Sequence, residues 1–186
     1  MTRAKAKDEV QDDSPRSLAE AEAETIEITF ADLGLSDRML ASLVAAGYKR
    51  PTPIQAQAVP LALNGRDLMG LAQTGTGKTA AFTIPIIERL MDGPKRTRAL
   101  ILTPTRELCQ QVEEAIRKYG QGTGLEVVSV YGGVGYDTQL KALREGVDVI
   151  VATPGRLIDH LEKQNVVFDD IEVLVLDEAD RMLDMG

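Results

Sequence analysis

The strongest constraint on the fold is an alternation of short apolar runs and longer helical stretches that begins near residue 67. Five runs rich in Val, Ile and Leu occupy residues 67–71, 98–103, 126–131, 147–152 and 171–176. Stretches typical of helices separate them at residues 78–91, 105–119, 136–144 and 154–163. Apolar strands joined by helices of this length form a parallel sheet with helices on both faces. The sequence therefore predicts a three-layer α/β domain.

Two helices are predicted ahead of this region. Ser36 is a suitable N-cap for a helix that runs to Ala46, and Gly47 would end it. The second helix begins at Thr52, where Gln55 completes a Thr-x-x-Gln capping box, and ends near residue 64. Residues 1–25 have dense mixed charge and no aromatic side chain, which predicts a disordered tail. We therefore assign the domain to residues 26–186.

Length and composition exclude several classes of protein. The 186 residues suffice for one domain, and no apolar run approaches the ~18 residues that a membrane span needs. We therefore expect a cytoplasmic protein without a membrane partner. A net charge of −8 argues against a protein that binds polyanions through a broad basic face. With one Cys and one His, a zinc site is disfavoured; Cys109 is predicted to pack as a small core residue and His160 to lie on the surface.

A phosphate-binding loop is predicted where the first apolar run turns into a helix. Residues 72–79 read Ala-Gln-Thr-Gly-Thr-Gly-Lys-Thr. Gly75 and Gly77 can adopt backbone angles closed to other residues, so successive N–H groups can surround phosphate oxygens. Lys78 would reach the β- and γ-phosphates, and Thr79 would offer its hydroxyl to Mg²⁺. The general pattern begins with Gly where this chain has Ala72, and a Gly-rich turn without a ligand is the alternative.

A second candidate site follows the last apolar run, which ends in Asp177-Glu-Ala-Asp180. A carboxylate at the end of a strand is where a P-loop enzyme holds Mg²⁺, and we assign this role to Asp177, acting through water. Glu178 would orient and polarise the attacking water. By itself the segment could equally be a strand that ends in a solvated acidic turn. Its occurrence together with Lys78 favours the catalytic interpretation.

Six signatures resemble one family, and they occur in that family's order. They are Phe30 ahead of residues 47–55 (Gly-Tyr-Lys-Arg-Pro-Thr-Pro-Ile-Gln), residues 72–79, Pro104-Thr-Arg-Glu-Leu108, Gly132-Gly133, Thr153-Pro-Gly-Arg156 and residues 177–180. Over residues 30–186 the chain resembles the first RecA-like domain of a DEAD-box ATP-dependent RNA helicase. The sequences of residues 132–134 and 180–186 resemble those of the bacterial members. The family's phosphate loop also opens with Ala.

The resemblance implies a RecA-like P-loop domain that uses ATP and Mg²⁺. Gln55 would select adenine, because an amide offers the acceptor and the donor that match the N6 and N7 groups of that base; alternatively, Gln55 only closes a helix end. By resemblance, Asp180 couples the adenine-reading region to the catalytic site. The other residues expected to bind the nucleotide are Phe30, Tyr48, Lys49, Arg50, Ala72, Gln73, Thr74, Gly75, Thr76, Gly77, Lys78 and Thr79.

The resemblance also implies an RNA site at the carboxyl ends of the strands. The expected residues are Pro104, Thr105, Arg106, Glu107, Gly133, Thr153, Pro154, Gly155 and Arg156. Backbone N–H groups, hydroxyls and guanidinium groups there would hold phosphates and riboses without reading bases. The segment that begins at Thr153 could alternatively be only a capped helix start. Tyr131 could stack on a base or be a half-buried strand residue.

In the family, a Ser-Ala-Thr motif and a second RecA-like domain follow the acidic tetrad, and neither occurs in this chain. The next strand would lie between the strand that precedes the phosphate loop and the one that ends at Asp177. We therefore expect a domain that is incomplete at its C-terminus and is marginally folded or dependent on association. The expected function is the ATP-binding half of an RNA helicase, weakly active alone. The alternative is a truncated, non-catalytic module that binds adenine nucleotide or RNA.

Overall fold

The computed structural model describes residues 28–73 and 75–184, so the predicted tail at residues 1–25 lies outside the described residues. Four parallel strands form one sheet in the order β2-β3-β1-β4. The strands are β1 (Ala99–Leu102), β2 (Val127–Val130), β3 (Val149–Ala152) and β4 (Val173–Leu176). Each lies within one of the predicted apolar runs. The α/β class and the parallel sheet are confirmed.

The predicted helices are present within a residue or two of their expected bounds. They are α2 (Asp37–Ala45), α3 (Pro53–Leu63), α4 (Lys78–Leu90), α5 (Arg106–Tyr119), α6 (Tyr136–Glu145) and α7 (Pro154–Glu162). A short 3-10 helix, η2 (Phe30–Leu33), and a C-terminal helix, α8 (Ala179–Asp184), were not predicted. Ser36 caps α2 by accepting a hydrogen bond from the backbone N–H of Met39. Within the described part of the chain, no helix has the length and apolarity to cross a bilayer.

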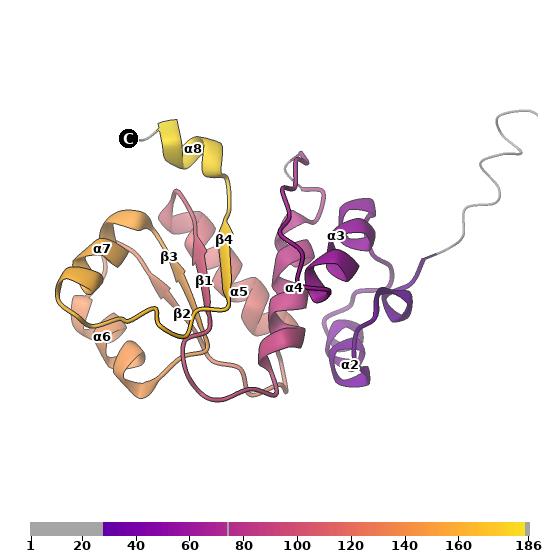
Figure 1. Cartoon of the computed structure of the whole chain (residues 1–186), viewed down its shortest axis with the longest axis horizontal. Coiled ribbons are helices and arrows are strands. Elements are labelled where there is room, and N and C mark those ends of the chain that lie inside the picture. Colours follow the sequence, from indigo (N-terminus) through magenta and orange to yellow (C-terminus); the bar gives the residue numbers. More distant parts are fainter. Residues whose placement is uncertain (1–27, 74, 185–186) are drawn as a thin grey trace, which may run out of the picture.

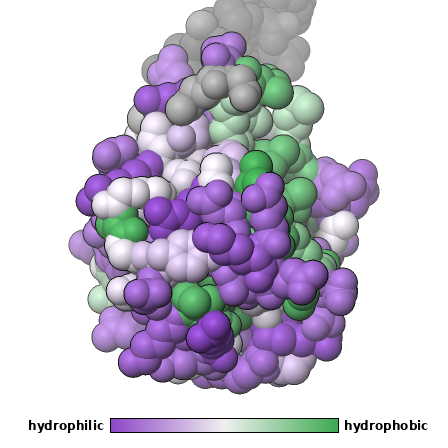
Figure 2. All heavy atoms as spheres, turned by 90° about the vertical axis from the view of Figure 1, so that its left-hand side faces the viewer, coloured by the Kyte–Doolittle hydropathy of each residue, from purple (hydrophilic) through white to green (hydrophobic). Residues whose placement is uncertain are grey.

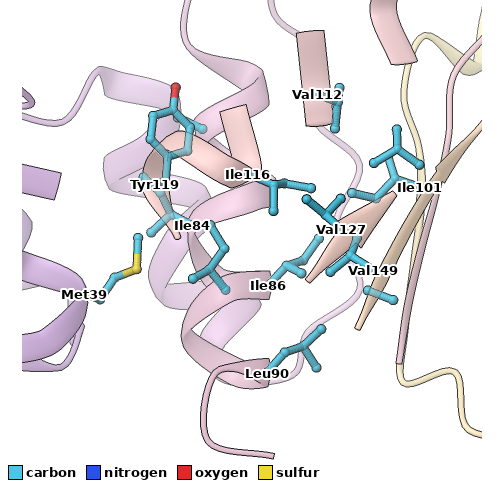
Figure 3. Packing of buried hydrophobic residues seen from close by; sticks show 14 of the residues in the cluster. Met39, Ile84, Ile86, Leu90, Ile101, Val112, Ile116, Tyr119, Val127 and Val149 are labelled. Atoms are coloured by element: carbon cyan, nitrogen blue, oxygen red, sulfur yellow. The ribbon is translucent and has the colours of Figure 1, made fainter. Parts of the chain in front are cut away.

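The main core lies between the sheet and the α4–α5 layer. Figure 1 shows α6 and α7 on one side of the strands, α4 and α5 on the other, and α2 and α3 beyond α4. Ile84 of α4, Ile101 of β1 and Val149 of β3 are all fully buried in this core. Figure 3 shows side chains of α4 and α5 pointing toward the strands, with Met39 of α2 approaching from the far side of α4. The N-terminal helices thus extend the same core.

A smaller core lies on the opposite face of the sheet. Ile150 and Ala152 of β3 are fully buried there, with Leu157 of α7 packed against them. The outer surface over α6 and α7 is largely hydrophilic, with separate hydrophobic patches (Figure 2). Because β3 is buried on both faces, it reads as a continuous apolar run, as expected for a central parallel strand.

The predicted strand at residues 67–71 is wrong for this structure. The segment has no regular secondary structure, and Met69 and Leu71 are 91% and 90% exposed. A strand exists only when a neighbour supplies the other half of its hydrogen-bond ladder. Among the described residues, no strand pairs with this segment. The apolar pattern of residues 67–71 indicated that the segment can pair as a strand, but none of the described strands pairs with it.

Strand β4 pairs with β1 on one edge only. Val173 and Val175 pack against the main core, whereas Leu174 and Leu176, which point to the other face, are more than half exposed. β4 is thus the least buried strand of the described sheet. The expectation that a further strand lies between β4 and residues 67–71 stays a prediction.

His160 is buried, so the prediction of a surface residue was wrong. The ring has no exposed surface and stacks on Tyr136, the first residue of α6, with centroids 4.4 Å apart. Position along α7 alone could not indicate that α6 covers this side chain. Burial lowers the pKa of His160, and the nearby charges of Arg156 and Lys163 lower it further. Cys109 packs in the core as predicted, and burial raises the pKa of its thiol to about 12.

Candidate active site

The predicted phosphate loop lies at the N-terminus of α4, and Lys78 is the first residue of that helix. Gly75 and Gly77 have φ values of +84° and +92°, which non-glycine residues rarely adopt. The Thr76 hydroxyl donates to the carbonyl of Gln73, 2.8 Å away, and closes the turn; Thr74 lies outside the described residues. The space around the Gly75 Cα is open. The loop thus has the backbone form of an anion cradle.

Gln55 braces the phosphate loop. Its Nε2 donates to the carbonyl oxygen of Gly77 at 3.2 Å, and its Oε1 accepts from the backbone N–H of Thr52 at 3.0 Å. The side chain is 1% exposed. The helix-capping interpretation is therefore correct, and the amide also joins α3 to the loop. Each end of the amide retains one further hydrogen-bonding position, which a base could use.

The aromatic residues expected near the base are largely turned into the protein. Phe30 is 5% exposed and contacts Tyr48 edge-on, with ring centroids 6.2 Å apart. The Tyr48 hydroxyl lies 2.6 Å from that of Tyr119. Lys49 and Arg50, by contrast, are exposed. Phe30 thus has little surface to offer a base, and its contact supports Tyr48.

Asp177 lies at the carboxyl end of β4 and is electrostatically linked to the phosphate loop. Its backbone N–H donates to the carbonyl of Leu102 at 2.9 Å, which joins the residue to the end of β1. Burial raises the pKa of the Asp177 carboxyl, and the neighbouring Glu178 raises it further, whereas the charge of Lys78 lowers it. A positive charge at Lys78 thus favours the ionised form of the Asp177 carboxyl, although the two residues are far apart in the sequence.

The acidic pair fits a divalent cation. A desolvated carboxylate beside a second carboxylate gains from a cation, and Mg²⁺ is usually held by one or two carboxylates together with substrate phosphates. Thr79 follows Lys78 in the first turn of α4, so its hydroxyl belongs to the same end of the helix. The chemistry of these donors matches Mg²⁺ better than a softer metal.

Glu178 has a strained backbone, with a φ of +50° between β4 and α8. Non-glycine residues in this region cost of order 1–3 kcal/mol and concentrate at functional sites. The Glu178 carboxylate accepts from the guanidinium of Arg181, 3.2 Å away. Asp180 lies exposed in the first turn of α8. Sequence reasoning missed both: the strain has no local sequence signal, whereas the ion pair joins residues three apart and could have been found from their spacing.

The residues predicted to bind RNA lie at the carboxyl ends of β1, β2 and β3, as the parallel sheet requires. Arg106, Glu107, Gly133 and Gly155 are exposed there, Pro104 is buried, and the remaining members are partly covered. Thr153 precedes the first residue of α7 but makes no side-chain capping bond, so its hydroxyl remains usable. Tyr131 is 8% exposed and does not present a face for a base to stack on.

Comparisons with known proteins agree with this geometry. A family model described as DEAD/DEAH box helicase matches residues 52–186. The chain is 51% identical over 161 residues to the ATP-dependent RNA helicase DeaD of Escherichia coli strain K12, and equally to that of Escherichia coli O6:H1 strain CFT073. Each match covers 86% of this chain and 26% of the relative. The chain therefore spans about a quarter of the length of these relatives.

Proposed function

The chain belongs to the DEAD/DEAH box helicase family, and from this premise we propose that it is the ATP-binding part of an ATP-dependent RNA helicase. It would bind ATP with Mg²⁺, hydrolyse it, and contact the RNA backbone to drive local unwinding of duplexes. Support comes from the phosphate loop, from the acidic residues that interact with it, and from relatives named as ATP-dependent RNA helicases.

ATP binding is proposed at the N-terminus of α4. The positive-φ glycines turn backbone N–H groups toward the phosphates, and Lys78 offsets their charge. Gln55 would read adenine with the hydrogen-bonding positions that its contacts with Thr52 and Gly77 leave free. The same amide also contacts the phosphate loop. Binding of the base would therefore be coupled to binding of the phosphates. Tyr48, Lys49 and Arg50 would border the base, with Phe30 behind Tyr48.

Hydrolysis is proposed to depend on the end of β4. Asp177 and the Thr79 hydroxyl would hold Mg²⁺, which when bound offsets charge on the transferring phosphoryl group. Glu178 would orient the attacking water and polarise it. Its carboxylate would first have to leave Arg181. Asp180 would couple these residues to the adenine side.

RNA and a second RecA-like domain are the proposed partners. The groups at the ends of β1, β2 and β3 are hydroxyls, backbone N–H groups and guanidinium groups, which hold phosphates and riboses with little sequence preference. Arginines supplied from outside a phosphoryl-transfer site are worth ~10³ or more in rate. We therefore expect slow turnover by this chain alone.

The observation that carries the proposal is the pair of positive-φ glycines, Gly75 and Gly77, at the N-terminus of α4. The test uses a chimera in which this chain replaces the 161-residue region that it matches in E. coli DeaD. ATP turnover is measured with and without RNA, for the chimera and for its Glu178→Gln variant. We expect RNA-stimulated turnover, lost on substitution while nucleotide binding persists. Unchanged turnover would contradict the role of Glu178.

The alternative, a non-catalytic module that binds adenine nucleotide or RNA, is favoured by one observation. The Glu178 carboxylate is paired with the guanidinium of Arg181 rather than directed at a water site. If the chimera binds ATP and RNA without turnover, and if Arg181→Ala does not restore it, the module is the better description. If Arg181→Ala raises turnover, the ion pair is only a resting contact.

A further inference from the structure

Arg106 is held over the ring of a buried tyrosine instead of pairing with a carboxylate. Its Cζ lies 5.3 Å from the centroid of the Tyr131 ring. Arg106 itself is exposed, whereas Tyr131 is 8% exposed and packs in the main core. Among residues 28–73 and 75–184, no acidic side chain forms an ion pair with Arg106. Seven other arginines among the described residues do form one: Arg38, Arg89, Arg96, Arg98, Arg117, Arg156 and Arg181.

This difference matters for an anion site. A carboxylate partner would cancel the charge that a phosphate needs, whereas an aromatic face orients a guanidinium and leaves its charge and its outer N–H groups available. Arg106 is the first residue of α5, beside the turn at Gly133. A Cβ at Gly133 would lie 3.7 Å from the Arg106 guanidinium, so this turn borders the same group.

Tyr131 accepts two hydrogen bonds. Its hydroxyl accepts from Nε2 of Gln110, 2.8 Å away and one turn after Arg106 on α5. Its backbone carbonyl accepts from Nε2 of Gln139, a 4% exposed side chain on α6, at 2.9 Å. The bond to the hydroxyl ties the ring to the helix that carries the arginine, and the ring cannot turn away without losing it; the bond to the carbonyl holds the backbone at the end of β2.

The same arrangement recurs once more along this edge of the sheet. Arg156 lies 5.5 Å from the centroid of the Tyr136 ring, and the Tyr136 hydroxyl accepts from Nδ2 of Asn165 at 2.6 Å. There, however, Lys163 lies closer to the ring, at 4.3 Å, and Arg156 approaches Asp159. Arg106 is therefore the clearer case.

We propose that Tyr131 is a positioning residue that orients the Arg106 guanidinium for a phosphate of single-stranded RNA. Tyr131 does not touch the RNA. This inference rests on the RNA-binding role proposed above for Arg106. Sequence reasoning considered Tyr131 as a stacking partner for a base, and the structure redirects its ring to the arginine.

The first measurement needs no RNA. NMR relaxation of the Arg106 Nε–H group reports how ordered the guanidinium is on the ps–ns timescale. We expect the order to fall in Tyr131→Leu and to persist in Tyr131→Phe, which keeps the ring. Val112→Ala is the control, because Val112 is an apolar residue of the same helix that is buried in the main core. Unchanged order in a folded Tyr131→Leu overturns the inference.

The second measurement is binding of a labelled oligouridylate about 10 nucleotides long, followed by fluorescence anisotropy across a salt series. Arg106→Ala should weaken binding about tenfold and reduce the slope of log K against log salt by about 0.7, the value of one phosphate on a single strand. Tyr131→Leu should weaken binding about two- to fivefold in the parent and have no effect in the Arg106→Ala background. A purely structural role would weaken both backgrounds equally and would overturn the inference.

The two proposals fail separately. If the parent does not bind the oligouridylate, or if Arg106→Ala binds it as well as the parent does, the proposed RNA role of Arg106 is wrong, while the ordering measurement still tests the contact with Tyr131. If Tyr131→Leu does not fold, Arg106→Lys replaces it: the charge remains but the planar stack is lost. This variant should keep the salt slope and lose about two- to fivefold in affinity. Equal affinity would overturn the inference.

Discussion

Replacing Gly77 by Ala tests whether the contact between Gln55 of α3 and Gly77 stabilises the phosphate loop. A Cβ on Gly77 would lie 2.4 Å from the Nε2 atom of Gln55, closer than real Cβ contacts allow. Gly75 provides a matched control, because its φ is also positive but a Cβ there meets nothing within 4 Å. Both variants carry the backbone strain of a left-handed alanine, and only Gly77→Ala displaces the amide.

The magnitudes follow from these two contributions. The left-handed conformation costs a non-glycine residue about 1–2 kcal/mol. Separating Gln55 from the Gly77 carbonyl leaves polar groups of a 1% exposed side chain unpaired, at about 1–3 kcal/mol. We therefore expect Gly75→Ala to lower the free energy of unfolding by about 1–2 kcal/mol and Gly77→Ala by about 2–5 kcal/mol. The difference between the two variants is the contribution of the hydrogen bond from Gln55 to the Gly77 carbonyl.

Chemical denaturation followed by circular dichroism measures this difference. Gln55→Ala removes the obstacle, so Gly77→Ala should cost less in that background, with a coupling free energy of about 1 kcal/mol or more. If both glycine variants are destabilised equally, or if the double variant is additive, the contact of Gln55 with Gly77 does not support the loop.

Three further predictions concern titrating groups. Because the pKa of His160 is lowered below its ordinary 6.5, the unfolded chain binds a proton more readily than the folded one; stability should fall as the pH drops through about 6.5, and His160→Phe should remove this dependence in denaturation curves. Because the pKa of Asp177 is raised, its charged form costs stability at neutral pH. In the absence of Mg²⁺, Asp177→Asn should therefore unfold at a denaturant concentration equal to or above that of the parent, while Mg²⁺-dependent nucleotide binding is lost. A clear loss of stability would contradict this. Burial raises the pKa of Cys109 to about 12, so iodoacetamide at pH 8 should modify the thiol only in the denatured protein, and labelling of the native chain at the denatured rate would refute its burial.

Elements with strong local signals could be predicted from the sequence. Strands β1 to β4 lie in runs rich in Val, Ile and Leu, and α2 begins at the side-chain cap expected at Ser36. The phosphate loop could be located from the pattern Gly75-Thr-Gly77-Lys-Thr79 before a helix, and both glycines have the positive φ values that this turn requires. Parallel strands place their carboxyl ends on one edge, so the common location of the candidate site followed from the pattern as well.

Tertiary structure alone decided the features that depend on a partner remote in the chain. Residues 67–71 have the composition of a strand, but a ladder needs a neighbour, and none of the described residues provides it. His160 has a polar position on its helix, but α6 brings Tyr136 over the ring. Arg106 and Tyr131 belong to separate elements, and only the packing of α5 on the end of β2 brings them together. The local sequence determines which helices and strands can form. Burial and strand pairing each require two surfaces in contact, so only the tertiary structure decides them.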